Sequence, residues 1–122
     1  MAILIEANKS YSFAGSSDEL INNSKDFLMT NGFTISGETS ITNGYSIHAK
    51  RGSETILRIL GALFTTNKQL PIKINLKILN DKEVVVLISS NISGIGSSFG
   101  LKNKYNNCFN EIFDSYLKIV GI

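Results

Sequence analysis

The chain is poor in residues that cross-link or interrupt a fold, since its 122 residues include one cysteine, one proline and one histidine. Cys108 has no second cysteine to pair with, which excludes an internal disulfide and favours a reducing compartment. With 43% hydrophobic and 18% charged residues, the composition is typical of a compact protein rather than a disordered one. We therefore expect one domain over residues 1–122, located in the cytoplasm.

Long apolar runs are also missing. The longest, Ile56 to Phe64, is interrupted by Arg58 and is about half of the ~20 residues that a membrane-crossing helix needs. The opening MAILIEANKS lacks the basic start and the cleavage site of a secretory signal. We expect no transmembrane segment, and we expect the opening residues to form a strand.

Residues with catalytic or metal-binding chemistry are isolated from one another in the sequence. His48 has no cysteine or second histidine near it, so a metal site would need carboxylates from distant segments. Cys108 has only Lys104, four residues earlier, as local support for a reactive thiol, and a small buried hydrophobic role is favoured. The sequence therefore predicts no catalytic residue, no metal site and no cofactor, and favours a non-enzymatic protein.

Alternating apolar residues predict the strands. From Ile3 to Phe13 the apolar residues fall on odd positions, and only Lys9 breaks the pattern. The segment FTISGETSITNGYSIHAK predicts two strands with a turn at Gly37-Glu38 or at Asn43-Gly44, and the second is favoured because Asn-Gly suits positive φ at both turn positions. PIKINLKILNDKEVVVLISSNI predicts an antiparallel hairpin with its turn near Asn80-Asp81.

Three helices are predicted. Ser16 and Glu19 match a capping box, which starts a helix over 17–31 that closes at Gly32. The almost entirely apolar segment SETILRILGALF predicts a short helix over 53–64. A final amphipathic helix has an apolar stripe made by Tyr105, Phe109, Ile112, Phe113, Tyr116, Leu117 and Val120.

These elements follow one another in the order β-α-β-β-α-β-β-α. Short hairpins imply a mainly antiparallel sheet of about five strands, with the three helices packed on one face. The predicted class is therefore α+β. No family motif can be matched in these residues, and an element order that many unrelated domains share says nothing about function.

Basic residues concentrate in the middle of the chain. Residues 50–104 include nine basic and three acidic residues, although the net charge of the whole chain is only +2. Spread-out lysines are typical of a solvated surface. Lys73 and Lys77 share a polar strand face with Asn75, but no aromatic residue lies between them, which argues against nucleic-acid binding.

The segment SNISGIGSSFGLKNKYNN, residues 90–107, is a candidate anion site. Gly94, Gly96 and Gly100 would let the backbone approach a phosphate, and Lys102 and Lys104 would add charge. The spacing fits neither the dinucleotide fingerprint nor the P-loop. The segment is either an anion cradle or a connection between a strand and a helix.

The favoured hypothesis is a domain that binds a small amphipathic or apolar ligand with an anionic end. Helix 53–64 would wall the pocket with Ile56, Leu60, Leu63 and Phe64. The anionic end would be met by Arg51 and Arg58, or by Lys102, Lys104 and the glycine backbone. Two alternatives stay open: a homodimer formed through helix 53–64, and a phosphate- or nucleotide-handling enzyme that uses Gly94 to Lys104.

Overall fold

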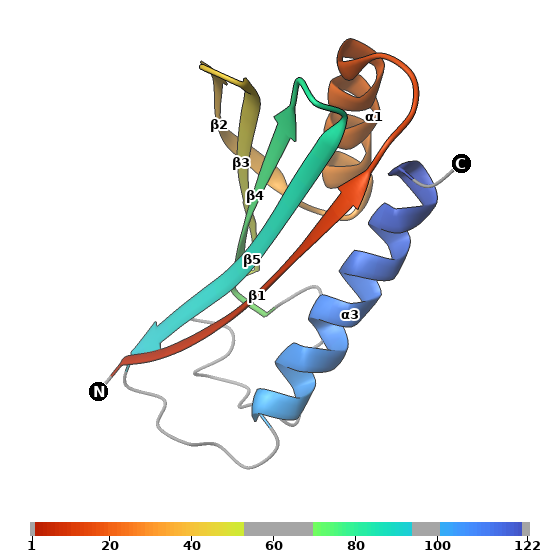
Figure 1. The fold of residues 1–122 in the computed structure, drawn as a ribbon. Helices are drawn as coiled ribbons and strands as arrows, with labels where there is room; N and C mark the ends of the chain where they lie inside the picture. Colours follow the sequence, from red (N-terminus) through yellow and green to blue (C-terminus); the bar gives the residue numbers. More distant parts are fainter. Residues whose placement is uncertain (1, 53–69, 94–100, 121–122) are drawn as a thin grey trace.

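A computed structural model describes residues 2–52, 70–93 and 101–120. With the labels of Figure 1, its elements are β1 (Ala2–Ser12), α1 (Ser17–Thr30), β2 (Thr34–Ile41), β3 (Gly44–Arg51), β4 (Ile72–Leu79), β5 (Glu83–Ser93) and α3 (Leu101–Val120). The five strands form one antiparallel sheet in the order β1-β5-β4-β3-β2. The α+β class and the antiparallel five-stranded sheet are confirmed, whereas the predicted helix over 53–64 lies outside the described residues.

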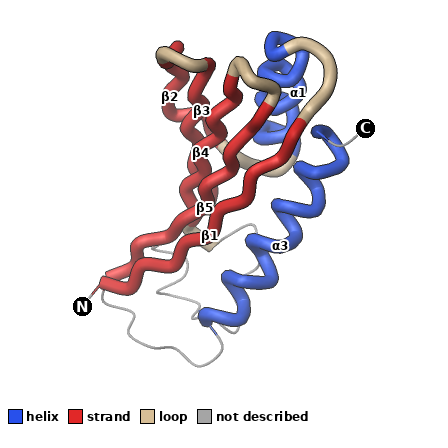
Figure 2. Tube along the Cα trace, viewed as in Figure 1, coloured by secondary structure: helices blue, strands red, loops and turns tan. Residues whose placement is uncertain are grey.

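The two described helices lie on the same side of the sheet (Figures 1 and 2). Because β1 and β2 form opposite edges, the segment that contains α1 connects one edge of the sheet to the other, and α1 itself contacts β2 and β4. Helix α3 runs along the β1 side and contacts both β1 and α1. We call the side that α1 and α3 cover the covered face, and the side that no described helix covers the open face.

The core lies between the sheet and the helices. Strands β4 and β5 alternate as the sequence predicts, with apolar side chains buried on the covered face and mostly polar ones on the other. The buried apolar residues described in the sheet are Ile5, Ile47, Ala49, Ile72, Ile74, Leu76, Ile78, Val84, Val86 and Ile88. The α3 stripe meets them with Tyr105, Phe109, Ile112, Phe113, Tyr116 and Val120. Each large apolar side chain buried in this way contributes about 1.5–3 kcal/mol.

Leu117 is the exception in the predicted stripe of α3. It is 46% exposed, so its assignment to the buried side is wrong. It follows the fully buried Tyr116 and is turned about 100° from it around the helix axis. The covered stripe is therefore narrower at this end of α3 than the run of apolar residues predicts.

Lys9 interrupts the apolar pattern of β1 without leaving the covered face. Its ammonium lies 5.1 Å from the centre of the Phe113 ring on α3. An exposed lysine can lay its stem along apolar surface and place its charge over an aromatic face. The lysine is thus compatible with the strand that the odd-numbered positions predict.

Both ends of α1 form as predicted. The Ser16 hydroxyl accepts a hydrogen bond from the Glu19 backbone N–H at 3.1 Å. At the other end, Gly32 has a φ of 85°, its N–H donates to Met29 O, and the Phe33 N–H donates to Leu28 O. This pair of bonds is a Schellman motif, which ends the helix and directs the chain into β2.

The β2–β3 turn lies one residue before the predicted Asn43-Gly44 and does not have the predicted conformation. Thr42 and Asn43 form it, and among the described residues neither Asn43 nor Gly44 has a positive φ. Gly44 is needed for a different reason, because a Cβ at this position would lie 2.0 Å from the Ile78 carbonyl oxygen of β4. The alternative turn at Gly37 falls inside β2, where a register shift after Ile35 marks a β-bulge.

The β4–β5 hairpin is confirmed, with its turn at residues 80–82. Lys82 has a φ of 67°, and its backbone N–H donates to Leu79 O at 3.2 Å. Its ammonium donates to Gly15 O and lies 5.6 Å from the centre of the Phe13 ring. These contacts join the hairpin tip to the segment that enters α1.

Candidate ligand site on the open face

The strand registers place rows of side chains on the open face, since directly opposite residues of an antiparallel pair share a face. The first row is Thr34, Lys50, Lys73, Ser89 and Glu6. The second is His48, Asn75, Leu87 and Asn8. The third is Thr39, Ser46, Lys77, Val85 and Ser10. These three rows are therefore mostly polar and mainly basic, with apolar side chains only at Val85 and Leu87 of β5, while Leu79 of β4 and Ile41 of β2 add apolar surface at the end of the open face near the β2–β3 turn.

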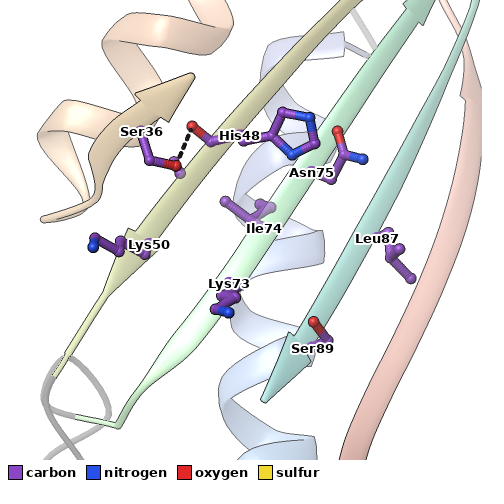
Figure 3. A pocket seen from close by; sticks show the side chains of 9 residues that line it. Ser36, His48, Lys50, Lys73, Ile74, Asn75, Leu87 and Ser89 are labelled. Carbon is purple, nitrogen blue, oxygen red and sulfur yellow. Dashed lines mark hydrogen bonds between the residues drawn. The ribbon is translucent and has the colours of Figure 1, made fainter. Parts of the chain in front are cut away.

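A hollow of about 440 Å³ lies over the first two rows (Figure 3). It is lined by Ser36, His48, Ala49, Lys50, Lys73, Ile74, Asn75, Leu87 and Ser89. The side chains of Ala49 and Ile74 are buried on the covered face, so these two residues meet the hollow through their backbone. The size is within the range of sites that hold small molecules.

Lys50 and Lys73 are the main charges of the hollow. They are direct cross-strand partners on β3 and β4, and both are exposed. Like charges placed opposite each other destabilise a sheet. Within residues 2–52, 70–93 and 101–120 neither lysine forms an ion pair, unlike Lys25 of α1, which lies 2.5 Å from Glu38 of β2.

Acidic charge in the same row lies at its far end. Glu6 of β1 comes after Ser89, so two strand spacings, roughly 10 Å, separate its position from that of Lys73. The Glu6 carboxylate therefore offsets little of the positive charge of the lysine pair, because water and salt screen the attraction between exposed charges at this distance.

A hydrogen-bonded chain orients the amide of Asn75. The Ser46 hydroxyl donates to Asn75 Oδ1 at 3.0 Å and lies 3.3 Å from His48 Nε2. Because a hydroxyl has one proton to give, His48 Nε2 must be the donor to Ser46 in this arrangement. The Asn75 amide nitrogen is then left with its two N–H groups, which find no acceptor in the part of the chain that the structure describes.

The β-bulge in β2 sets the rim of the hollow. Ser36 is the extra residue of the bulge, and its hydroxyl donates to the His48 carbonyl oxygen at 3.2 Å (Figure 3). At the opposite side, Leu87 and Ser89 of β5 close the hollow. The hollow is therefore lined by two lysines and the amide of Asn75, with hydroxyls at its borders and one apolar side chain, that of Leu87.

Comparisons with protein-family models, with curated proteins and with solved structures gave no match to this chain. Function has to be argued from the chemistry of the site.

The structure places Arg51, a predicted ligand contact, on the covered face. It is 9% exposed, and its guanidinium donates to Asn31 O at 3.0 Å and to Cys108 Sγ at 3.3 Å. It also lies 4.6 Å from the centre of the Phe33 ring. These contacts join the end of β3 to α1 and α3, while a ligand role for Arg51 stays a prediction.

Of the other predicted site residues, Lys104 has a described side chain, and it does not line the hollow. Lys104 is half-buried in the first part of α3, and the side chain of Lys102 is not described. The remaining predicted site residues lie outside the described ranges: Ile56, Arg58, Leu60, Leu63, Phe64, Gly94, Gly96 and Gly100. The predicted apolar pocket and the predicted glycine cradle therefore stay predictions.

Cys108 is a small buried residue, as the sequence predicts. It is 1% exposed, and burial raises the pKa of its thiol despite the opposing effect of the nearby Arg51 charge. A protonated buried thiol is a poor nucleophile. In the described ranges, no three histidine, cysteine or acidic side chains are close enough to hold a metal, and no helix there is long and apolar enough to span a bilayer.

The main residues of the hollow could be found only in part from the sequence. Alternation groups Lys73 with Asn75 on one strand, and Ser46 with His48 and Lys50 on another. Nothing in the local pattern says that these two strands are neighbours, or in which register. Only the β3–β4 pairing brings Lys50 opposite Lys73.

Proposed function

We propose that this protein is a non-catalytic binding module that holds a small amphipathic ligand by its anionic end. The ligand occupies the hollow on the open face. The observation that supports the proposal is the direct opposition of Lys50 and Lys73 within that hollow. This arrangement costs stability in the empty protein and favours a bound anion.

The cost can be estimated from Coulomb's law. Two unit charges about 5 Å apart in water repel each other by about 0.8 kcal/mol, and the flexible side chains reduce this by moving apart. An anion between the two ammonium groups replaces this repulsion with two attractions. Because both lysines are exposed, we expect modest affinity that falls with added salt.

The remaining lining suits the rest of such a ligand. The N–H groups of Asn75 and the hydroxyl of Ser89 can donate to further oxygens at the anionic end. Leu87 is half-buried and offers apolar surface beside these donors. A ligand with one charged end and a short apolar body would satisfy both parts of the hollow.

An amide-resolved NMR titration with octanoate tests the proposal. We expect shifts at Lys50, Lys73, Asn75 and Ser89, and each of Lys50→Gln and Lys73→Gln should weaken binding by about tenfold. Lys77→Gln is the matched control, because Lys77 is an exposed lysine of the same strand face that does not line the hollow. Octanoate shifts that survive both glutamine substitutions would contradict the proposal.

Dimerisation through helix 53–64 and phosphate handling by residues 94–104 remain predictions, because both segments fall outside the described residues.

A further inference from the structure

We infer that the anionic end of the ligand is a dianion, and that its chemical class is a phosphomonoester. The inference rests on the proposed function, since it names the ligand of the same hollow. It follows from the number and placement of the donors there, and from the charge that each class of anion has.

The charge of the hollow matches a dianion. Lys50 and Lys73 bring two positive charges to one cross-strand position, and the nearest acidic residue of their row, Glu6, lies two strands beyond Lys73. A carboxylate or sulfonate would neutralise one of the two charges. A phosphomonoester has a charge of about −1.5 to −2 near neutral pH and neutralises both.

The donors also match the shape of a phosphoryl group. In the first row the Ser89 hydroxyl lies next to Lys73 within the hollow, whereas Thr34, next to Lys50, is in the same row but does not line the hollow. The amide of Asn75, oriented by Ser46, adds N–H donors from the second row. Three terminal oxygens can therefore find donors on several sides, whereas the two oxygens of a carboxylate would leave some donors unused.

The hollow favours a soluble ligand over a membrane headgroup. A protein surface that rests on a bilayer buries a set of large apolar side chains in the interface. Among the described open-face residues whose burial is known, the apolar side chains are those of Ile41, Leu79, Val85 and Leu87, and all four are already half-buried. Glu6 on the same face would in addition repel an anionic membrane.

The test compares three probes that share an aromatic ring and differ in the anion: phenyl phosphate, benzenesulfonate and benzoate. At about pH 7.5 and constant ionic strength, phenyl phosphate should bind about tenfold more tightly than either monoanion. Toward about pH 5 the phosphate becomes a monoanion, and its advantage should fall to about twofold or less. Benzenesulfonate keeps one charge throughout, so it reports any change in the protein itself.

Substitutions test which lysines cause the preference for phenyl phosphate over the two monoanions. Lys50→Gln or Lys73→Gln leaves one charge in the hollow, so each should remove the preference for phosphate while weak binding of all three anions persists. Lys77→Gln should retain the full preference, because Lys77 does not line the hollow. Thermal unfolding of each variant without probe shows that the fold is intact.

The outcomes separate the two proposals. Equal binding of all three probes, weakened by Lys50→Gln, would overturn the dianion inference and leave the proposed function standing. If none of the probes binds, both fall. A second assay measures cosedimentation of the protein with phosphatidylcholine vesicles that contain phosphatidic acid. The assignment to a soluble ligand would be overturned if the protein bound these vesicles at a phosphatidic acid concentration at which the same concentration of phenyl phosphate does not bind.

Discussion

The two faces of the sheet use the same strands for different purposes. On β4 the buried residues Ile72, Ile74, Leu76 and Ile78 alternate with Lys73, Asn75 and Lys77 on the open face. The covered face excludes water and supplies most of the stability. The open face contributes little to the core, so it can contain a repulsive pair such as Lys50 and Lys73. A fold that is stabilised by its covered face tolerates a costly arrangement on its open face.

Two neighbouring residues of β3 show the same contrast. Lys50 lies on the open face and is exposed, whereas Arg51 lies on the covered face and donates to Asn31 O and Cys108 Sγ. Both are basic, and one residue separates a charge available to a ligand from a charge used to hold elements together. The face, not the residue type, decides the role.

The largest expected difference between the two faces is in the free energy of unfolding that is lost when one large side chain is removed from each face. Leu76→Ala deletes a fully buried side chain and should lower the free energy of unfolding by about 2–5 kcal/mol. Leu87→Ala, on the open face, should lower it by about 1 kcal/mol or less, because Leu87 is only half-buried. Chemical denaturation measures both. Equal losses would show that the open face is packed against something in solution.

A titratable group on the covered face should make stability depend on alkaline pH. Burial raises the pKa of Tyr116 to about 12, although its 2.8 Å hydrogen bond with Ser24 acts in the opposite direction. The pKa of Tyr116 in the folded protein lies above its unfolded value of about 10. The contribution of the protonated phenol to the free energy of unfolding is therefore complete below pH 10 and is lost as the pH rises from about 10 to 12.

The size of this alkaline loss is about 2–3 kcal/mol. Tyr116→Phe should remove most of the dependence, while it costs about 1 kcal/mol at neutral pH through the lost Ser24 bond. Denaturant titrations at several pH values between about 8 and 12 measure both effects. Tyr45→Phe is the control, since Tyr45 of β3 is partly exposed and the alkaline loss should survive its removal.

The adjacent pair of β3 gives the next largest contrast. Arg51→Met removes the buried guanidinium together with its hydrogen bonds to Asn31 O and Cys108 Sγ. It should lower the free energy of unfolding by about 1.5–3 kcal/mol. Lys50→Met should change stability by a few tenths of a kcal/mol and in the stabilising direction, because it removes repulsion. If Lys50→Met were the more destabilising change, the assignment of the two faces would be wrong.

The smallest expected effect on the free energy of unfolding tests the charge repulsion between Lys50 and Lys73 directly. Lys73→Glu places opposite charges across β3 and β4 and should raise the free energy of unfolding by about 0.5 kcal/mol. Lys77→Glu should change it by less, since the cross-strand partners of Lys77 are Ser46 and Val85. Thermal melts at low and high salt measure the difference, which salt should reduce. The same Lys73→Glu protein should no longer bind the anionic probes, so stability would increase as binding is lost.

Much of the fold follows from local patterns. The capping residues of α1, the Schellman motif at Gly32 and the alternation of β4 are each set by neighbours within a few residues, and each is confirmed. The β2–β3 turn shows where such patterns fail. Asn-Gly predicted positive φ, whereas Gly44 is required by the approach of Ile78 from another strand. A contact between strands leaves no signal in a four-residue window.

The sequence by itself determined which side chains of each strand share a face, because successive Cβ atoms point to opposite sides of a strand. It did not determine which residues stand opposite each other. A shift of β4 by two residues would keep Lys50 and Lys73 on the open face and yet place Lys50 opposite Asn75 or Pro71. The register between β3 and β4 depends on packing against the other strands and the helices. Only the tertiary structure could therefore bring the two lysines together.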